Sequence, residues 1–250
     1  MQTSMRSVSA LQKDQAKRCV RLEQKERPAQ ARLRRPQRQQ RKRRVDRSEA
    51  MKKLQERCGC TADGSFGPNT ARAIAKHYDL SPNRAAHLLG QASHESGGFT
   101  ITKESLYYST PERLCKVWPS RFKTVEDAMP YAKNPKALAD KVYSNRMGNG
   151  EGEGHIYIGR GFIQLTGKDN YRSFASDMRV PEVMNDPSLV ETDYAFESAM
   201  WFFEKNGLFK MADNGIGTDN IKAITKRVNG GTHGLDDRIN QTQKIYSWLA

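Results

Sequence analysis

Two glutamates in this sequence have the side-chain type and the spacing needed for acid–base chemistry. Glu95 ends an apolar stretch, and the pair Gly97-Gly98 that follows lets the chain turn and a ligand approach the backbone closely. Glu104 lies nine residues beyond Glu95. Two carboxylates on either side of a turn can face each other across a cleft, so that one protonates a leaving oxygen while the other activates a water. The pair therefore predicts glycoside hydrolysis, whereas a single glutamate would predict only a surface carboxylate.

A second group of polar side chains lies in residues 159–167, which read GRGFIQLTG. Gln164 and Thr166 alternate with Ile163 and Leu165, so both polar side chains share one face if this piece of chain is extended. An amide and a hydroxyl on one face can bind sugar hydroxyls or position a water. A third polar segment, residues 229–238, is on spacing alone an ordinary connection between two helices.

Helical periodicity and helix-start signals predict the elements that position these residues. Ser81 is expected to cap a helix that has Pro82 in its first turn and runs to Glu95. Further helices are expected at residues 51–58, 68–78, 111–117, 124–132, 135–144, 170–178, 193–205, 218–228 and 235–248. The Gly-rich residues 145–161 must form a loop, and weak strand signals occur at 155–158 and 162–165. The predicted fold class is mainly α, with a central Gly-rich loop and at most a minor β element.

The positive charge of the chain is concentrated at its N-terminus. Of a net charge of +14 over 250 residues, residues 1–50 carry +11, from 16 Lys and Arg against 5 Asp and Glu. This segment contains no aromatic residue, so it cannot bury enough apolar surface to offset its ordering entropy. We expect a disordered or loosely helical segment suited to a polyanion: nucleic acid, anionic lipid or the bacterial envelope. The alternative is that Met51 is the natural start of the protein.

Targeting signals and cysteines add little chemistry. The N-terminus lacks the apolar core of a secretory signal, and no stretch approaches the roughly 18 apolar residues of a membrane span. The four cysteines form no CxxC pair, which favours reduced thiols of a protein made in a cytosol. A metal site built from Cys58, Cys60 and His77 is the less favoured alternative. We therefore expect no metal and no cofactor.

Five segments together resemble glycoside hydrolase family 19, the chitinase-like enzymes with a lysozyme-type fold. They are HESGGF (94–99), ESLYYS (104–109), VYSNRMGN (142–149), GRGFIQLTGKDNY (159–171) and NGGTHGLDDR (229–238). All five occur in the family's order, and the resemblance runs from about Ser81 to the C-terminus. Within the family, the chain is most similar to phage endolysins of Gram-negative hosts. The resemblance implies a lysozyme-like, chitinase-like helical catalytic domain over residues 81–250.

The resemblance also implies roles for single residues. Glu95 matches the general acid, Glu104 the second carboxylate acting as general base, and Thr166 the residue that holds the nucleophilic water. Arg238 matches a position that lines the sugar cleft or supports the acid, and His94 is expected to support the acid from behind. The complete set of expected substrate-binding residues is His94, Tyr107, Tyr157, Gln164, Asn170, Asn229 and Arg238. In this chain, Tyr157 is the aromatic residue before the Gly-Arg-Gly segment that is expected to stack on a sugar.

Residues 51–80 resemble part of a second kind of domain. The pieces KLQ (53–55) and DGSFGPNT (63–70) are similar to motifs of the small three-helix peptidoglycan-binding module. The gap between the two pieces is short, and a complete module is about twice as long. One interpretation is a working wall-binding module. The favoured interpretation is a truncated remnant whose helices pack on the catalytic domain.

Three functions remain open from the sequence. The leading hypothesis is a monomeric endolysin that cuts the MurNAc–GlcNAc strands of peptidoglycan by an inverting two-carboxylate mechanism and so lyses the host. It would be made in the host cytoplasm and reach the periplasm and cell wall through a separate holin. Residues 1–50 would be attracted to the anionic outer membrane or another lipid surface, with no specific nucleic acid as partner.

The two other hypotheses differ in substrate or in activity. The second hypothesis is a chitinase acting on GlcNAc polymers, against which the missing secretory signal argues. The third is a non-catalytic protein that binds the wall or another polyanion. The complete set of Glu95, Glu104 and Thr166 argues against the third hypothesis.

Overall fold

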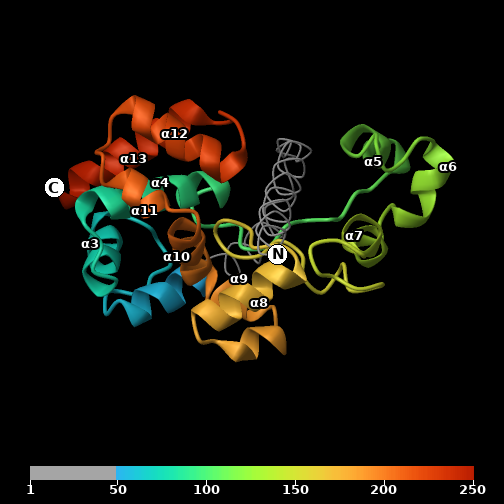
Figure 1. Cartoon of the computed structure of the whole chain (residues 1–250), viewed down its shortest axis with the longest axis horizontal. Coiled ribbons are helices and arrows are strands. Elements are labelled where there is room, and N and C mark those ends of the chain that lie inside the picture. The colour runs from blue at the N-terminus through green and yellow to red at the C-terminus, as the bar shows by residue number, and fades with distance from the viewer. Residues whose placement is uncertain (1–48) are drawn as a thin grey trace, which may run out of the picture.

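The computed structural model describes residues 49–250, so the expected disordered segment lies, apart from its last two residues, outside the described residues. Helices build two lobes of unequal size (Figure 1). The larger lobe contains the helix of residues 49–57, α3 (Pro68–His77), α4 (Pro82–Glu95), α10 (Ala195–Lys205), α11 (Leu208–Ala212), α12 (Thr218–Asn229) and α13 (Leu235–Leu249). The smaller lobe contains α5 (Pro111–Val117), α6 (Val125–Ala128), the 3₁₀ helix η1 (Met129–Tyr131) and α7 (Pro135–Tyr143).

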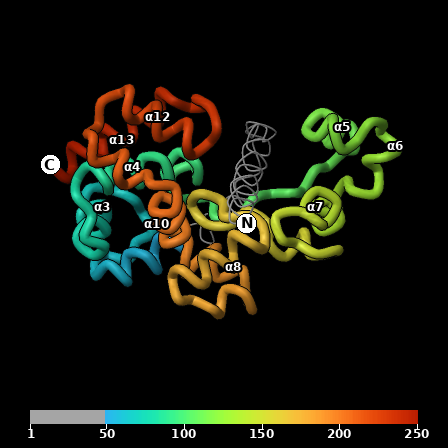
Figure 2. The backbone as a smooth tube through the Cα atoms, viewed as in Figure 1, coloured from blue at the N-terminus to red at the C-terminus, as the bar shows by residue number. Residues whose placement is uncertain are grey.

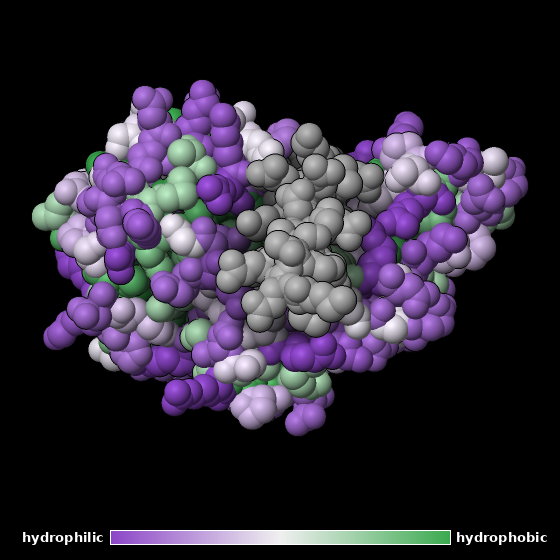
Figure 3. All heavy atoms as spheres, viewed as in Figure 1, coloured by the Kyte–Doolittle hydropathy of each residue, from purple (hydrophilic) through white to green (hydrophobic). Residues whose placement is uncertain are grey.

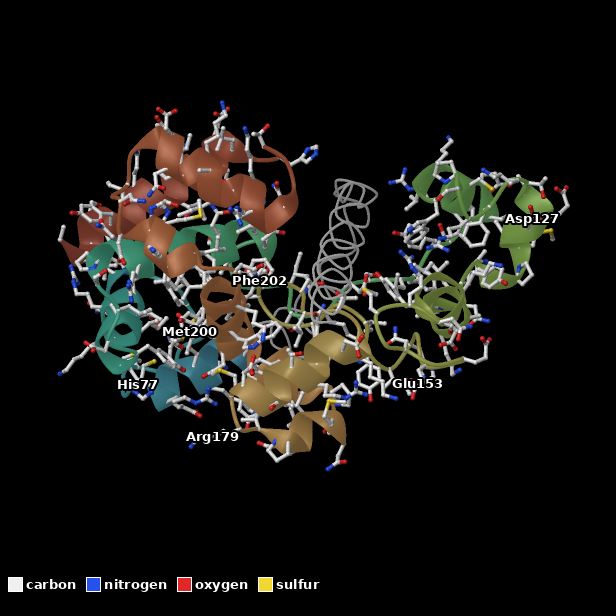
Figure 4. The ribbon with its side chains drawn as sticks, viewed as in Figure 1. His77, Asp127, Glu153, Arg179, Met200 and Phe202 are labelled. Atoms are coloured by element: carbon white, nitrogen blue, oxygen red, sulfur yellow. The ribbon has the colours of Figure 1, made fainter. Side chains whose placement is uncertain are left out.

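The chain crosses between the two lobes and then returns. After α4 it runs across to α5, and after α7 it returns through a long loop to α8 (Lys168–Asp177) (Figure 2). The 3₁₀ helix η2 (Pro181–Met184) and α9 (Leu189–Thr192) follow α8 and precede α10. Asp127 lies at the outer end of the smaller lobe, and Glu153 lies near α8 (Figure 4). The prediction that residues 145–161 form a loop is confirmed.

Short polar residues followed by proline begin three of the helices. Ser81 Oγ accepts a hydrogen bond from the backbone N–H of Arg84 at the start of α4. Thr110 begins α5 and Asn134 begins α7 with the same kind of bond, and a proline is the next residue in all three cases. The side-chain oxygen satisfies an N–H that the helix leaves unpaired, and proline is tolerated there because its missing N–H is not needed.

Helix α4 is the central element of the larger lobe. Residues 85–93 of α4 are all buried, and its most extensive contact is with α13. The two helices meet at Gly90, where an added Cβ would lie only 2.9 Å from Cα of Thr242. Glycine is therefore required for this close approach. Because α4 is packed on every side, its last residue, Glu95, has a fixed position.

Each lobe has its own apolar core. The core of the larger lobe joins α3, α4, α10, α11, α12 and α13. The core of the smaller lobe is centred on Leu114, Phe122 and Leu138. A third cluster packs α8, η2 and α9 against Trp201, which is 7% exposed. Trp201 is therefore a core residue.

Residues 49–80 are part of the larger lobe. Ala50, Met51 and Leu54 belong to the same apolar core as α4 and α13. Phe66 packs against Phe99 with a distance of 4.4 Å between ring centroids. Residues 49–80 therefore share the apolar core of the larger lobe.

The structure corrects several expected elements. A continuous helix over 124–132 was expected, but α6 ends at Ala128 and η1 takes its place. Pro130 explains this break, because proline cannot donate the hydrogen bond of a helix interior and its ring clashes with the preceding turn. Residues 155–158 and 162–165 form no strand, since in residues 49–250 only isolated bridges pair Arg160 with Lys103 and with Leu165. The short helices α9, α11 and η2 were not predicted.

The visible surface is mostly hydrophilic (Figure 3). No helix in the described part of the chain is long and apolar enough to cross a membrane. Within residues 49–250, no group of three or more His, Cys, Asp or Glu side chains could hold a metal ion. Cys58, Cys60 and Cys115 are free thiols, and burial raises the pKa of Cys58 to about 12.

Candidate active site

Glu95 is held at the end of α4 by an arginine from another helix. Arg238, in the first turns of α13, is 2% exposed, and its Nη2 donates to Glu95 Oε1 at 2.5 Å. The side chain of Glu95 is 22% exposed. A charge-assisted bond of this kind is stronger than a neutral one and orients the carboxylate. Arg238, for which the sequence left open a place in the sugar cleft or a contact to the acid, is buried here against Glu95.

The loop between α12 and α13 holds Arg238 in turn. The backbone carbonyl of His233 accepts from Arg238 Nε at 3.0 Å and from Asn229 Nδ2 at 3.1 Å. Asn229 Oδ1 also accepts from the backbone N–H of Gly231 at 2.8 Å. Asn229, expected to bind substrate, therefore braces the loop that positions Arg238.

His94 lies beside Glu95 and binds α13. Its Nδ1 is 2.6 Å from Oδ2 of Asp237, and its side chain is 27% exposed. The ring packs against Gly234, where an added Cβ would lie 2.0 Å from the imidazole. His94 therefore fixes the C-terminal end of α4 against the start of α13.

Glu104 is held by neutral donors from two elements. Tyr143, at the end of α7, donates to Glu104 Oε2 at 2.9 Å, and the backbone N–H of Gly159 donates to Oε1. The backbone N–H of Glu104 also donates to the carbonyl of Gly159 at 2.9 Å. Glu104 thus joins the smaller lobe, through Tyr143, to the Gly-Arg-Gly segment.

Three side-chain oxygens meet beside Gly159. An added Cβ at Gly159 would lie 3.0 Å from Gln164 Oε1, 3.1 Å from Thr166 Oγ1 and 3.2 Å from Glu104 Oε1. The three oxygens therefore surround the position that a Cβ of residue 159 would occupy. The structure brings together here two residues expected to act in catalysis, Glu104 and Thr166, and one expected to bind substrate.

The backbone of residues 164–170 is shaped to present these oxygens. Gln164 has a positive φ of 60°, an uncommon conformation for a residue other than glycine, and its Nε2 donates to the carbonyl of Gly161 at 2.9 Å. Thr166 Oγ1 donates to the carbonyl of Gln164 at 2.9 Å. Asn170 Nδ2 donates to the carbonyl of Thr166 at 2.8 Å, so Asn170 supports this segment from α8.

The Glu95 group and the Glu104 group are linked by the chain between them. The backbone N–H of Gly161 donates to the carbonyl of Thr102 at 2.8 Å. Phe99 packs edge-on against Phe162 with 5.0 Å between ring centroids. The segment that follows Glu95 is therefore fastened to the segment that carries Gln164 and Thr166.

The charge of Glu104 affects two tyrosines around it. Burial and then the negative charge of Glu104 raise the pKa of Tyr108. Burial also raises the pKa of Tyr171, with a smaller contribution of the same sign from Glu104. Both phenols therefore stay protonated at neutral pH.

Two of the expected substrate-binding residues lie outside these groups. Tyr157 is 6% exposed and packs against Tyr171 with 5.4 Å between ring centroids. The ring of Tyr157 belongs to the buried cluster around α8, whereas sugar stacking needs an exposed ring face. Tyr107 is 51% exposed on the chain that leads to α5.

Sequence reasoning missed two partners of Glu104. Tyr143 was present in the motif VYSNRMGN but received no role, and the N–H of Gly159 was not considered. Presence in a family motif was the one available signal for Tyr143. Its hydroxyl contacts a residue 39 positions away in the chain, a pairing that local pattern cannot show.

Glycoside hydrolysis requires two carboxyl groups, and Glu95 and Glu104 are each held by their own hydrogen bonds. A family model described as chitinase class I, of glycoside hydrolase family 19, matches residues 71–214, more than half of the chain. A glycosyl hydrolase family 19 domain-containing protein of Haemophilus influenzae is 34% identical over 172 residues, which cover 66% of this chain and 80% of that protein. The chain belongs to glycoside hydrolase family 19.

Plant and bacterial chitinases are also similar to this chain. An endochitinase of Arabidopsis thaliana is 28% identical over 180 residues, covering 69% of this chain and 50% of the plant protein. An acidic endochitinase of Petunia hybrida is 31% identical over 142 residues, covering 56% and 39% of the two chains. The chain therefore spans half or less of these plant relatives. Chitinase C of Streptomyces griseus superposes with a TM-score of 0.47 at 18% identity, covering 81% of this chain and 93% of that one.

Proposed function

We propose that this protein hydrolyses the β-1,4 glycosidic bonds of peptidoglycan glycan strands with inversion, and that it serves a phage as its endolysin. The observation that supports the chemistry is the meeting of Glu104, Gln164 and Thr166 beside Gly159, in a chain that also holds Glu95 through Arg238. An inverting glycosidase needs one carboxyl group as acid and one as base, with a water between the base and the sugar.

Glu95 is the proposed general acid. Arg238 binds Oε1 of Glu95, which leaves Oε2 to carry the proton toward the leaving oxygen. When the proton has been transferred, Glu95 is a carboxylate and the guanidinium stabilises its new charge. No step of this reaction needs a cofactor.

Glu104 is the proposed general base, with Thr166 as the residue that holds the water. The hydroxyl hydrogen of Thr166 is donated to the carbonyl of Gln164, so the lone pairs of Oγ1 are available to accept a hydrogen bond from a water. Glu104 Oε1 lies on the same side of Gly159 and can accept the other hydrogen of that water. The oxygen of the water is then directed at the anomeric carbon.

Two observations bear on the substrate. The charge of +11 in residues 1–50 favours the anionic bacterial envelope and therefore peptidoglycan. The similarity to plant proteins named endochitinases favours the second candidate, a chitinase acting on GlcNAc polymers. In the endolysin proposal, the enzyme is made in the host cytoplasm and a separate holin releases it to the periplasm and the wall.

The test compares two substrates. Turbidity loss of permeabilised Gram-negative cells is measured beside sugar release from colloidal chitin, with Glu95→Gln as the inactive control. Faster action on the cells, with new reducing ends in peptidoglycan identified by mass spectrometry, supports the proposal. Action on chitin alone selects the chitinase, and loss of turbidity equal to that of Glu95→Gln contradicts the endolysin.

The stereochemical part has its own measurement. NMR recorded immediately after cleavage of a short oligosaccharide should show the α-anomer as the first product, because the water attacks the face opposite the leaving group. A β-anomer or a trapped glycosyl-enzyme would contradict inversion.

A further inference from the structure

A buried hydrogen-bond chain runs from Thr225 on α12 through Gln91 on α4 to Arg238 on α13. Gln91 Nε2 donates to Thr225 Oγ1 at 3.0 Å. Arg238 Nη1 then donates to Gln91 Oε1 at 2.6 Å, while its Nη2 binds Glu95. Thr225 and Gln91 are fully buried and Arg238 nearly so. Three helices thus contribute one side chain each to a chain that ends at Glu95.

The chemistry of Gln91 suits its place in this chain. Its amide accepts from Arg238 with the oxygen and donates to Thr225 with the nitrogen, so the bond to Thr225 fixes which end of the amide faces the arginine. Gln91 and Glu95 are four residues apart on α4 and therefore share one face of the helix. Arg238 can bind both side chains at once with its two Nη atoms.

The charge of Arg238 is directed at Glu95 because Gln91 is neutral. Within residues 49–250, the ion pairs of the structure assign Arg238 a single carboxylate partner, Glu95. Without the amide of Gln91, the buried guanidinium of Arg238 would have an N–H donor with no acceptor, which is energetically costly. The guanidinium would then rotate toward another acceptor. That rotation would move the carboxylate that it binds.

We propose that Gln91, locked by Thr225, is a positioning residue for the acid Glu95. It holds the guanidinium of Arg238 at the angle that binds one oxygen of Glu95 and leaves the other to transfer the proton. Because it acts through Arg238 on an assigned acid, the proposal rests on the proposed function of Glu95. Neither Gln91 nor Thr225 touches the substrate.

Substitutions at the two ends of this chain test the proposal. Gln91→Leu removes both hydrogen bonds and should lower kcat by about tenfold, the value of one well-placed hydrogen bond in the transition state, with KM within about twofold of wild type. Thr225→Val removes only the lock on the amide and should lower kcat by about threefold. Thr225→Ser keeps the hydroxyl and should restore the wild-type kcat.

Thr242→Val is the matched control. Thr242, like Thr225, is a fully buried threonine that faces α4, where it lies against Gly90. Its hydroxyl has no hydrogen-bond partner among the described residues, so it has no link to Arg238. The same substitution on another helix that packs against α4 should therefore leave kcat unchanged. Thermal unfolding of each variant shows that it is folded at the assay temperature.

The assay uses the soluble oligosaccharide or muropeptide that the wild-type enzyme cleaves, with Glu95→Gln measured beside the other variants. A lower kcat in Gln91→Leu and Thr225→Val, with Thr225→Ser and Thr242→Val at the wild-type value, supports the proposal. An inactive Glu95→Gln with full kcat in Gln91→Leu and Thr225→Val overturns the positioning role and leaves the proposed function standing. Full activity of Glu95→Gln overturns both. An equal loss in Thr242→Val and Thr225→Val overturns the positioning role, because packing alone then explains it.

Discussion

The two carboxylates of the candidate site have different hydrogen-bond partners. Glu95 binds a buried guanidinium, whereas Glu104 binds a phenol and a backbone N–H. A fixed positive charge is most useful to the group that becomes an anion during the reaction, which is the acid. Neutral donors orient a carboxylate without neutralising it, which suits the group that accepts a proton from water. These partners support the division of roles proposed for the two residues.

Removing the proton of the acid should stop the reaction. Glu95→Gln keeps the shape of the side chain but cannot donate a proton, so kcat should fall by about 10² or more. Glu104→Gln should cost less, because Gln164 and Thr166 still hold the water. Steady-state kinetics on a soluble oligosaccharide measures both variants, with circular dichroism as the folding control. A Glu95→Gln enzyme with nearly normal kcat would rule out Glu95 as the acid.

A methyl group at Gly159 should block the base side of the site. The Cβ of Gly159→Ala would lie 3.0–3.2 Å from the oxygens of Gln164, Thr166 and Glu104, tighter than ordinary van der Waals contact. Gly159 does not have a positive φ, so alanine fits its backbone. We expect kcat to fall by at least about tenfold, as for a misplaced reacting group, while the protein still folds.

Gly217→Ala is the matched control for this substitution. Gly217 has a φ of −62° and nothing within 4 Å of an added Cβ, so activity and thermal stability should stay at the wild-type values. Equal kcat in Gly159→Ala and Gly217→Ala would show that the three oxygens do not hold the reacting water.

Among the elements, a row of aromatic rings connects the N-terminal part of the larger lobe to the site. Phe66 packs on Phe99, with 4.4 Å between centroids, and Phe99 packs on Phe162, with 5.0 Å. Gln55 holds the loop that carries Phe66, with its amide bonded to Asp63 and to the carbonyl of Ser65. The segment that resembles a wall-binding module thus supports the turn after Glu95 from behind.

Shortening Phe66 separates the two interpretations of residues 51–80. If the segment supports the site, Phe66→Ala should lower the free energy of unfolding by about 2 kcal/mol, since Phe66 is half-buried, and should lower kcat on a soluble oligosaccharide. If the segment is an independent wall-binding module, cleavage of the soluble substrate should be unchanged and only binding to sacculi should weaken. Chemical denaturation, kinetics and a sacculus pull-down give the three readouts.

For the protein as a whole, acid should lower stability in two stages. Burial lowers the pKa of His87 from 6.5, partly offset by its hydrogen bond to the carbonyl of Gly215. A group whose pKa is lower in the folded than in the unfolded protein stabilises the fold at pH values above its unfolded pKa. This contribution is lost as the pH falls from the unfolded pKa through the folded pKa. Several carboxyl groups also have a lowered pKa. Hydrogen bonds and ion pairs lower the pKa of Asp177 and of Asp213 from the ordinary value of 3.8. The first loss should therefore begin below pH 6.5 and the second below about pH 4.

The histidine stage can be removed separately. His87→Gln keeps a donor for the carbonyl of Gly215 but does not titrate, so its Tm should be flat between about pH 7.5 and 5.5, where that of the wild type falls. Both proteins should lose stability alike below about pH 4. Parallel Tm curves above pH 5.5 would show that another group causes the first stage.

The basic N-terminal segment should act by charge alone. Residues 1–48 hold 16 Lys and Arg against 4 Asp and Glu and no aromatic residue, and every candidate catalytic residue lies beyond them. Beginning the chain at Glu49 keeps Ala50 in the core and should leave cleavage of soluble fragments intact. Binding to outer membranes should weaken, most clearly at low salt, because the Debye length is about 8 Å at physiological ionic strength. Equal activity of both chains on intact Gram-negative cells in low-salt buffer would leave the segment without this role.

Local sequence is sufficient to show where most helices begin and to propose which residues belong to the site. Helix starts are local: Ser81, Thr110 and Asn134 each satisfy an N–H three residues away, so the signal is complete within one turn. The order of the motifs along the chain is likewise a property of the sequence, and it is enough to indicate the family. Helices of four or five residues, such as α9 and α11, were not predicted, because they are too short to show a helical periodicity.

The role of each site residue depends instead on tertiary packing. Arg238 binds Glu95 across 143 positions of sequence, and Tyr143 binds Glu104 across 39. Such pairings depend on how helices pack, which no local pattern encodes. Burial is also a tertiary property: the sequence does not show that Tyr157 lies in the core or that Arg238 is buried against Glu95. The type of a side chain limits the reactions and contacts that it can take part in. Its neighbours and its access to solvent decide which of these occur in the folded protein.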